Sequence, residues 1–416
     1  MRSPGSLALG ASLVLLAACG SPTDRSPGPP PLLTALPRSL TAAESRLIAA
    51  GNEFGFSLFR EARAAAPDGN AFLSPTSAAM ALGMTLNGAA TATFDSMRVA
   101  LRLGDASQAD INAGFRSLID LLRGLDNSSR FEIANSIWAR AGVPFFPMFL
   151  DIGRASFDAE VRALDFGSPT ALPTINDWVK QKTGGKIPTI LDQIAGNEVM
   201  FLINAIYFKG SWRVAFDPAK TRTAAFHAAD GTTQQVPTMV LEPSPLRYGG
   251  TEDAEVVELL YGNGAFAMTL VLPRSGKTLG DLVAGLDTAQ WNRWTATVHE
   301  AEIGLTLPRF QLEYQRRLND DLSALGMRIA FDDRRADFTR MADVAPERLY
   351  LTKVIQKTFV DVNEEGTEAA AATSVGIGVT SLPMTVAVDR PFLFAIRERL
   401  SGTILFLGQI ARIPGV

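Results

Sequence analysis

The chain has very few of the residues on which most catalytic and metal sites depend. Among 416 residues there are two histidines, His227 and His299, and one cysteine, Cys19. A single cysteine excludes an intramolecular disulfide. Neither histidine stands in a metal-ligand spacing such as H-E-x-x-H, so the sequence predicts no metal site. Stability must therefore come from core packing, and a chain of this length that is 47% hydrophobic is able to bury a large core.

Recognisable enzyme and cofactor motifs are also missing. No G-x-S-x-G nucleophile elbow occurs. Residues 276–278 have the Gly-Lys-Thr ending of a phosphate-binding loop, but Val271 stands where such a loop needs glycine. Gly376 and Gly378 lack the third glycine of a dinucleotide-binding loop. These absences point away from catalysis and predict that the protein needs no cofactor.

The charge of the chain argues against nucleic acid as a partner. Lys and Arg number 39 and Asp and Glu 43, a net charge of −4, and no dense basic run interrupts this balance. Proteins that bind nucleic acid concentrate cations to neutralise phosphates. The sequence therefore predicts no nucleic-acid partner.

The N-terminus has the features of an export signal. Arg2 is followed by an apolar run over residues 7–18 that is too short to span a bilayer. The run ends in Leu-Ala-Ala-Cys at positions 16–19, which resembles the cleavage box of bacterial lipoproteins; an ordinary signal peptide with a chance cysteine is the alternative. We expect a signal peptide over residues 1–18 and lipidation of Cys19. The protein would then be exported to the extracellular or periplasmic side and anchored to a bacterial membrane only through that lipid.

The remaining chain is expected to form a tether and one domain. Residues 19–43 are rich in Pro, Ser and Gly, which predicts a tether without core-forming capacity before a domain over residues 44–416. Thr41 and Glu44 have the spacing of a capping box at a helix start. Ser74 fits as the N-cap of a second helix, with Pro75 at its first position.

Strand patterns are concentrated in the second half of the chain. Residues 255–260 and 265–272 are expected to pair as a hairpin through the Gly-Asn-Gly turn at 262–264. Further apolar or alternating segments predict strands over 131–140, 199–208, 303–307, 392–396 and 403–407. Helices in one half and strands in the other, without regular alternation, favour an α+β fold over a doubly wound parallel sheet.

The most unusual segment lies near the C-terminus. Residues 364–372 read Glu-Glu-Gly-Thr-Glu-Ala-Ala-Ala-Ala, and alanine favours helix. The following residues oppose a long helix, because Gly376 and Gly378 break it and the β-branched residues between them prefer extended chain. From local preference alone, a short helix followed by a surface loop and an extended functional loop both remain open.

Blocks of sequence over most of the chain resemble the serpins, the serine protease inhibitor family. They occur in family order between about residues 44 and 413 and comprise residues 70–77, 204–212, 307–310, 336–339, 389–394 and 402–408. The resemblance implies a serpin fold, in which helices surround three β-sheets. It also implies a reactive loop over about 364–388 that can insert into the central sheet. The protein would be a monomeric inhibitor rather than an enzyme.

The resemblance also implies which bond a protease attacks. In the family pattern the scissile residue lies 16 positions after the hinge glutamate, here Glu364, and 11 before the proline of the C-terminal signature, here Pro391. Both counts give Thr380, so the bond is Thr380–Ser381, with Val379–Thr380 as the alternative if the register slips by one. These small side chains suit an elastase-like or subtilisin-like protease rather than one that requires Arg or Lys.

The implied mechanism is suicide inhibition. The protease forms an acyl-enzyme at the cut bond, and the freed loop inserts into the sheet, so that the bound protease is displaced before the ester is hydrolysed. The small residues of the hinge permit this insertion, and we expect the hinge to be largely exposed before cleavage. The hinge residues are Glu364, Glu365, Gly366, Thr367, Glu368, Ala369, Ala370, Ala371 and Ala372.

Supporting residues follow from the same resemblance. Trp212, Arg309 and Glu364 match the point where the loop first enters the sheet, and Arg309 is expected to pair Glu364 bidentately. Ser74, Ser77 and Asn204 match a hydrogen-bonding cluster beneath the opening region of the sheet. Gln356 occupies the position where the family often has a histidine, and its amide is able both to donate and to accept hydrogen bonds.

Two other functions compete with inhibition. One keeps the fold but makes the protein a chaperone, carrier or storage protein; such members often have charged or bulky hinge residues, unlike the alanines at 369–372. The other is an exported hydrolytic enzyme, which the missing catalytic motifs disfavour.

Overall fold

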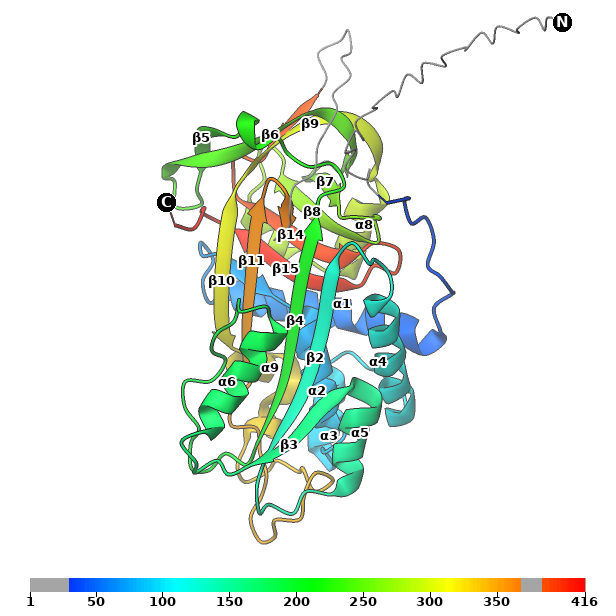
Figure 1. Ribbon diagram of the computed structural model, residues 1–416, viewed down its shortest axis with the longest axis vertical. Helices are drawn as coiled ribbons and strands as arrows, with labels where there is room; N and C mark the ends of the chain where they lie inside the picture. Colours follow the sequence, from blue (N-terminus) through cyan, green and yellow to red (C-terminus); the bar gives the residue numbers. More distant parts are fainter. Residues whose placement is uncertain (1–29, 368–383, 416) are drawn as a thin grey trace, which may run out of the picture.

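Two β-sheets and the helices around them make up the part of the chain that the computed structural model describes, residues 30–367 and 384–415 (Figure 1). The α-helices are α1 Ala42–Ala64, α2 Pro75–Leu86, α3 Thr91–Ala100, α4 Gln108–Arg123, α5 Pro147–Phe157, α6 Ala171–Lys182, α7 Leu279–Ala284, α8 Thr288–Ala296 and α9 Asn319–Leu322. The strands are β1 Ala71–Leu73, β2 Arg130–Arg140, β3 Ala159–Leu164, β4 Met200–Ser211, β5 Arg222–His227, β6 Thr233–Gly250, β7 Ala254–Leu260, β8 Phe266–Pro273, β9 His299–Pro308, β10 Phe310–Arg317, β11 Ile355–Asn363, β12 Gly366–Thr367, β13 Thr385–Ala387, β14 Phe392–Glu398 and β15 Ile404–Ile410.

The helix starts follow the sequence signals. The Thr41 hydroxyl accepts a hydrogen bond from the Glu44 backbone N–H, and the Glu44 carboxylate accepts one from the Thr41 backbone N–H, which is the predicted capping box of α1. Ser74 caps α2, with Pro75 at its first position. The predicted α+β class, these two caps and the hairpin of β7 with β8 are therefore confirmed.

Hydrogen bonds connect the described strands into two sheets, where three were expected. One sheet has nine strands, in the order β1-β15-β14-β8-β7-β6-β9-β13 with β5 beside β6. The physical reason is β6, an 18-residue strand that pairs with β9 over most of its length and with β7 at its end. Its register shifts between Leu241 and Ser244, which divides this sheet into two parts that share one strand.

The other sheet has the order β10-β11-β12-β4-β2-β3 and runs along the long axis of the molecule (Figure 1). Helix α2 lies behind it, and α6 covers its front face, where Trp138 and Trp178 meet edge to face at 6.0 Å. Phe72 stacks between Phe394 and Phe406, with ring centroids 5.4 and 5.2 Å away, and joins β1 to the nine-stranded sheet. Helices α2 and α6 therefore cover opposite faces of the six-stranded sheet.

The structure differs from the expected tether from residue 30 onward. Leu33, Leu36 and Leu40 pack against the main core. The carbonyl of Leu33 accepts a hydrogen bond from Arg399 at 2.6 Å, and that of Pro30 accepts one from Arg213 at 2.6 Å. Three spaced leucines and these bonds make residues 30–41 part of the folded domain.

The segment of residues 30–41 also supplies a cation to a buried carboxylate. Arg38 forms two hydrogen bonds with Glu44, at 2.6 and 2.8 Å, and Ser117 donates a third at 2.8 Å. The Arg38 hydrogen bonds, together with those from Thr41 and Ser117, lower the pKa of Glu44 to about 2, although burial alone would raise it. Glu44 is fully buried, so its charge depends on these partners.

Glu44→Gln should therefore destabilise the protein at pH 7 but not at low pH. Because the folded pKa lies below the unfolded value of 4.5, the wild type gains this stability above pH 4.5 and loses it as the pH falls toward 2. The loss at pH 7 should be about 2 kcal/mol, since solvent screens the partly exposed Arg38. Urea unfolding at pH 7 and pH 3 measures it, and an unchanged pH dependence in the variant would contradict the assignment.

Candidate functional site

The six-stranded sheet is split along its centre. On one side of the split, β4 pairs with β2 over ten residues, and on the other β11 pairs with β10 over eight. Within the described residues, β4 and β11 are linked as strands only by the two-residue β12, which lies between their upper ends. Figure 1 shows β4 and β11 running side by side below this point. The arrangement leaves a place for one further strand.

Strand β12 is the beginning of the predicted hinge. Gly366 lies opposite Ser211 of β4 and Asn363 of β11, and Thr367 lies opposite Gly210 and Val362. A Cβ atom on Gly366, whose φ is +152°, would lie 2.1 Å from the Gly210 carbonyl oxygen, so this position requires glycine.

The expectation of an exposed hinge is wrong at Thr367. This residue is only 2% exposed, and its hydroxyl lies 2.7 Å from the hydroxyl of the fully buried Tyr261. Burial raises the pKa of Tyr261, so its hydroxyl stays protonated and available as a hydrogen-bond donor. The hinge has entered the sheet this far because β-pairing on both sides satisfies its backbone and the facing Gly210 leaves room for its side chain.

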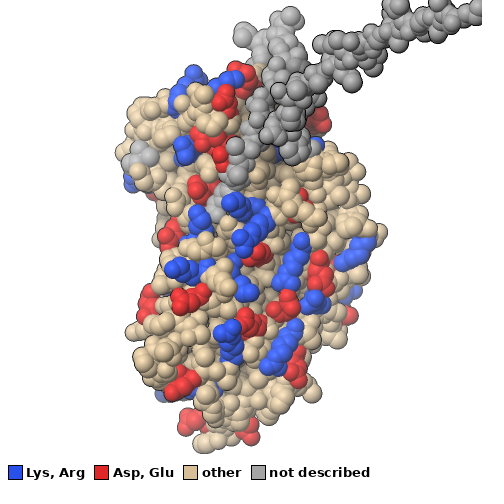
Figure 2. All heavy atoms as spheres, viewed as in Figure 1, with Lys and Arg blue, Asp and Glu red and all other residues tan. Residues whose placement is uncertain are grey.

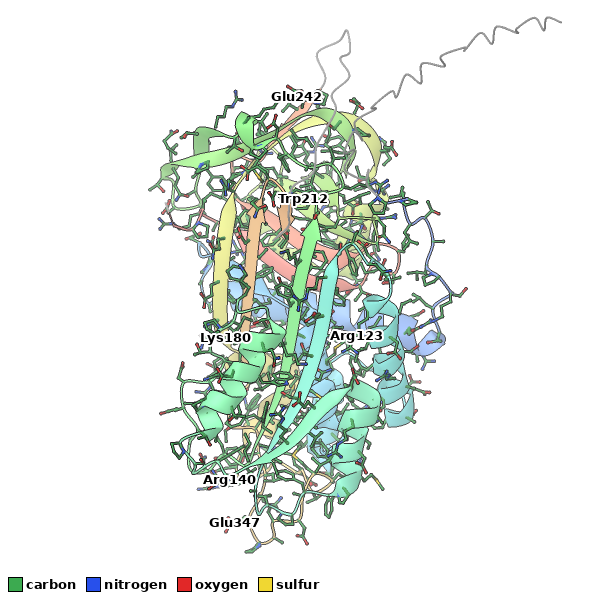
Figure 3. The ribbon with its side chains drawn as sticks, viewed as in Figure 1. Arg123, Arg140, Lys180, Trp212, Glu242 and Glu347 are labelled. Atoms are coloured by element: carbon green, nitrogen blue, oxygen red, sulfur yellow. The ribbon has the colours of Figure 1, made fainter. Side chains whose placement is uncertain are left out.

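Trp212, at the upper end of β4 in Figure 3, holds the turn that leads into β12. Its indole N–H donates to the Asn363 carbonyl at 2.9 Å, and its ring stacks on Tyr261 with centroids 4.5 Å apart. Its backbone N–H donates to the Glu365 carbonyl at 2.9 Å, and the Phe216 N–H donates to the Glu364 carbonyl at 3.0 Å. The turn is therefore fixed by both backbone and side-chain contacts.

The three residues expected at the loop entry do lie together, but the ion pair differs from the expectation. The Glu364 carboxylate is buried, and one oxygen lies 3.5 Å from Nε of Arg309, whose side chain is half exposed. The other oxygen accepts a hydrogen bond from the Thr221 hydroxyl at 2.5 Å. Thr221 thus occupies the site that a bidentate arginine would need.

Sequence reasoning did not identify Thr221 and Tyr261 as site residues. Thr221 lies beyond the family block at 204–212 and was assigned no role, and its partner Glu364 is 143 residues further on. Tyr261 lies at the end of a predicted strand, next to a hairpin turn. No local signal links it to Thr367, because only the folded sheet brings the two together.

The four residues of the expected opening cluster are also brought together. Gln356 makes a reciprocal pair with the Ser74 backbone: its carbonyl oxygen accepts from the N–H at 2.9 Å, and its amide donates to the carbonyl at 2.8 Å. The Ser77 hydroxyl donates to the Asn204 carbonyl at 3.5 Å. The glutamine thus bridges β11 to the start of α2, and Ser77 bridges α2 to β4.

Asn204 remains incompletely satisfied. Its amide nitrogen donates to Asn135 at 2.6 Å, while its buried side-chain oxygen has no hydrogen-bond partner among the described residues. An unpartnered buried oxygen favours rearrangement of the site, because a new donor there would be stabilising.

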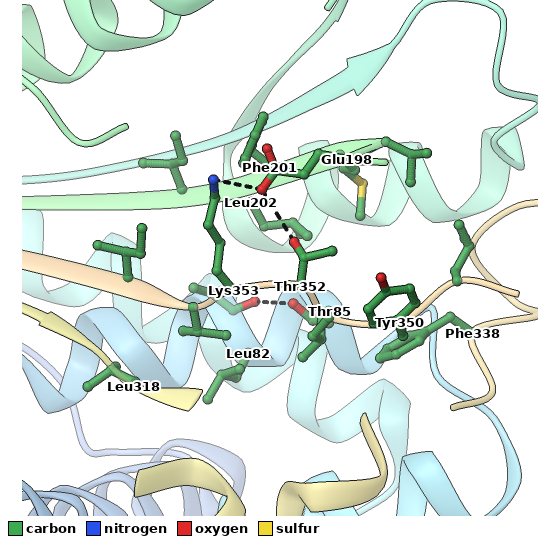
Figure 4. A pocket seen from close by; sticks show the side chains of 18 of the residues that line it. Leu82, Thr85, Glu198, Phe201, Leu202, Leu318, Phe338, Tyr350, Thr352 and Lys353 are labelled. Atoms are coloured by element: carbon green, nitrogen blue, oxygen red, sulfur yellow. Dashed lines mark hydrogen bonds and ion pairs between the residues drawn. The ribbon is translucent and has the colours of Figure 1, made fainter. Parts of the chain in front are cut away.

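A cavity of about 520 Å³ lies below this cluster, between the lower parts of β4 and β11 (Figure 4). Its lining is mostly apolar and includes Leu82 of α2, Leu202 of β4, Phe338 and Val354. A space of this size between two unpaired strand edges is uncommon in a protein interior, which is normally close-packed.

Several expected site residues lie outside the described residues. They are Cys19, Glu368, Ala369, Ala370, Ala371, Ala372, Val379, Thr380 and Ser381. Over residues 30–367 and 384–415, no group of three or more His, Cys, Asp or Glu side chains is arranged to hold a metal ion. No helix in the same ranges is long and apolar enough to cross a membrane. Figure 2 shows positive and negative side chains interspersed over one face of the molecule.

Comparison with known proteins identifies the family. The model of the serpin (serine protease inhibitor) family matches residues 49–413. Leukocyte elastase inhibitor from Sus scrofa is 36% identical over 380 residues, which cover 88% of this chain and 99% of that protein. Neuroserpin from Gallus gallus is 33% identical, over 86% and 90% of the two chains.

Solved structures agree on the fold. The native state of the thermophilic serpin tengpin superposes with a TM-score of 0.81 at 30% identity, covering 92% of this chain and 98% of that one. Human thyroxine-binding globulin complexed with thyroxine superposes with a TM-score of 0.81 at 28% identity, covering 89% of this chain and 100% of that one. The chain belongs to the serpin family of serine protease inhibitors and has the serpin fold, which thyroxine-binding globulin shares.

Proposed function

We propose that this protein inhibits serine endopeptidases by the suicide-substrate route. The observation that carries the proposal is the position of β12. This two-residue strand pairs with both β4 and β11, and below it, within the described residues, no strand lies between them. A segment that follows Thr367 directly would have both the position and the direction to complete this sheet.

The register of β12 predicts where the rest of the loop would lie after insertion. Because both pairings are antiparallel, each later loop residue faces a residue one position earlier in β4 and in β11. Residue 373 would then face Asn204 and Gln356, two of the four residues of the opening cluster. Its threonine side chain would offer a donor to the unsatisfied Asn204 oxygen.

The same register matches the apolar lining of the cavity. Side chains alternate between the two faces along a strand, so odd-numbered loop residues such as 369 and 371 would point to the same face of the sheet as Thr367. Val375 would face Leu202 and Val354, and Ile377 would face Met200 and the segment before β11, which line the cavity. The small residues at 369 and 371 would lie in the upper part of the gap, and the larger Val375 and Ile377 would fill the cavity in its lower part.

Insertion provides the means of inhibition. The protease serine attacks the carbonyl of Thr380, the peptide bond to Ser381 breaks, and the serine is left esterified to the loop. From Gly366 to Thr380 is 15 residues, about 50 Å as a strand. Complete insertion would carry the esterified protease along the sheet before water hydrolyses the ester.

The bait residues indicate the class of protease. Thr380, or Val379 if the bond is one position earlier, is small and branched and fits a small apolar specificity pocket. We therefore infer that the target is an elastase-like or subtilisin-like enzyme. The similarity to leukocyte elastase inhibitor supports this inference.

A non-inhibitory role as a carrier, chaperone or storage protein is the second candidate, because thyroxine-binding globulin has the same fold. Three features of the hinge argue against it. Thr367 is already accommodated in the sheet, Gly366 fits where no other residue does, and four alanines follow at 369–372.

Incubation with a subtilisin-like or elastase-like protease should give a covalent complex that survives boiling in detergent. The released C-terminal peptide should begin at Ser381, or at Thr380 for the earlier bond. Denaturing gels and mass spectrometry measure both results. Cleavage by every protease of the panel without any covalent complex would contradict inhibition, and a peptide that starts elsewhere would overturn the assigned bond.

Two substitutions at Thr367 serve as controls for this experiment. Thr367→Arg should still be cut, but insertion would bury a guanidinium without a partner, so the protease should be released active. The native form of this variant should also be less stable, because Thr367 is already buried. Thr367→Ala keeps a small side chain and should trap the protease as the wild type does.

We also propose that the protein acts as an exported monomer, held at a bacterial membrane by lipid on Cys19. The support is the Leu-Ala-Ala-Cys box at 16–19 behind a short apolar run. Lipid attached at Cys19 would hold the inhibitor at the membrane surface, where proteases outside the cell can reach it.

The anchor predicts a change in partitioning. Wild-type protein produced from the full chain in a bacterial host should enter the detergent phase, and Cys19→Ser should remain in the aqueous phase. Detergent phase separation followed by mass spectrometry of the N-terminus measures both. Wild type recovered in the aqueous phase with an unmodified N-terminus would rule the anchor out.

A further inference from the structure

Within the described residues, side chains rather than a strand join the two halves of the split sheet at its lower end. Glu198 precedes β4 and Lys353 precedes β11, and Oε1 of the glutamate lies 2.7 Å from Nζ of the lysine. The Thr352 hydroxyl donates to the same carboxylate oxygen at 3.4 Å. Figure 4 shows both contacts beside the cavity. Glu198 is only 3% exposed, and its other carboxylate oxygen accepts a hydrogen bond from the Ala195 backbone N–H at 2.7 Å. Lys353 therefore supplies the countercharge from across the split.

Each partner of the ion pair is fastened to its own half of the sheet. On the β4 side, the Glu198 carbonyl accepts a hydrogen bond from Arg140, the last residue of β2, at 2.8 Å. On the β11 side, the Thr352 carbonyl accepts one from Asn319 at 3.1 Å, and Asn319 also accepts the Val354 N–H at 2.9 Å. When the halves separate, the two charges must therefore separate with them.

Three further contacts cross the split at the same level. The Lys353 ammonium donates to the Gln193 carbonyl at 3.3 Å. The Lys353 ammonium lies over the ring of Phe201, 5.4 Å from its centroid. The Asn197 amide donates to the Tyr350 hydroxyl at 3.1 Å. The ion pair is thus the charged centre of a group of contacts that closes the lower end, as β12 closes the upper end.

We propose that the Glu198–Lys353 ion pair is a latch that limits how fast the sheet opens at its lower end. The latch would set the fraction of attacking protease that is trapped. This inference deepens the function proposed above and rests on it. A strand inserted between β4 and the segment before β11 requires their backbones to stand about 9.6 Å apart, twice the usual strand spacing. In the open sheet the buried carboxylate loses its cation, so opening is opposed by this pair.

Neutralising the carboxylate should speed opening. Glu198→Gln keeps the shape of the side chain and an oxygen that accepts hydrogen bonds. It has no carboxylate charge that would lose its cation when the sheet opens. Lys353→Met removes the other partner, and Lys353→Arg retains the cation. We expect loop insertion in the intact protein to become at least about tenfold faster in Glu198→Gln, which corresponds to about 1.4 kcal/mol in the barrier.

The test follows spontaneous insertion in the full chain. Intact protein is held at one temperature below its unfolding midpoint, and its conversion to a urea-resistant form is followed on urea-gradient gels. Glu198→Gln and Lys353→Met should convert faster than the wild type, and Lys353→Arg at the wild-type rate. The double variant should convert no faster than Lys353→Met alone, because that change already removes the ion pair that Glu198→Gln removes.

The chain offers a matched control in another buried carboxylate. Asp321 is 4% exposed and pairs with Arg316 at 2.6 Å, but both residues lie on the β10 side of the split. Asp321→Asn should lower stability without accelerating insertion. Equal rates of conversion in Glu198→Gln and Asp321→Asn would overturn the latch.

Thermal unfolding of the intact and the loop-cleaved protein gives a second measurement, which applies even where spontaneous conversion is slow. The loop is cut with a catalytic amount of papain, a cysteine protease. Glu198→Gln should lower the midpoint of the intact form only, because the pair is already broken after insertion, whereas Asp321→Asn should lower both. Equal lowering of both midpoints by Glu198→Gln would also overturn the latch.

These outcomes separate the latch from the proposed function. If the wild type traps no protease while Glu198→Gln still converts faster than Asp321→Asn, inhibition fails and the latch stands. If the wild type traps subtilisin while all variants convert at the wild-type rate, the latch fails and inhibition stands. When both hold, Glu198→Gln should form a larger share of covalent complex with subtilisin than the wild type does.

Discussion

The structure depends on one open place between two β-strands. Within the described residues, β4 meets another strand on its inner side only at Gly210 and Ser211, although it is 12 residues long. Unpaired strand edges attract a further strand. Each backbone hydrogen bond that such a strand makes contributes about 1 kcal/mol, so filling the place with some dozen residues would be worth on the order of 10 kcal/mol. In the proposed mechanism, the native fold keeps this energy available until the loop is cut.

In the proposed mechanism, contacts at the two ends of the gap regulate access to that energy. At the upper end, Trp212, Tyr261 and Thr221 hold the turn and the first two hinge residues in the sheet. At the lower end, the two halves are joined around Glu198 and Lys353. Gln356 and Ser77 connect both halves to α2 between these ends. The helix beneath the sheet therefore has contacts with each side that must move.

The sequence alone predicted the fold class, several helix and strand ends and the family, because these depend on local signals and on blocks of residues that stand in order. The grouping of Trp212, Arg309 and Glu364 was also predicted, but through the resemblance. The burial of Thr367 was not, since it depends on the space beside Gly210 and on Tyr261, 106 residues earlier. The Glu198–Lys353 pair was missed for a similar reason: neither residue belongs to a motif, and only the fold brings them into contact.

The central claim is that the intact protein lacks one strand that its own loop supplies after cleavage. Thermal unfolding of the wild type before and after a cut in the loop tests this claim most directly. The cut form should unfold more than about 20 °C above the intact form, since about 1 kcal/mol shifts the midpoint of a large domain by roughly 2 °C. A cut form that unfolds at the same temperature or lower would contradict the account.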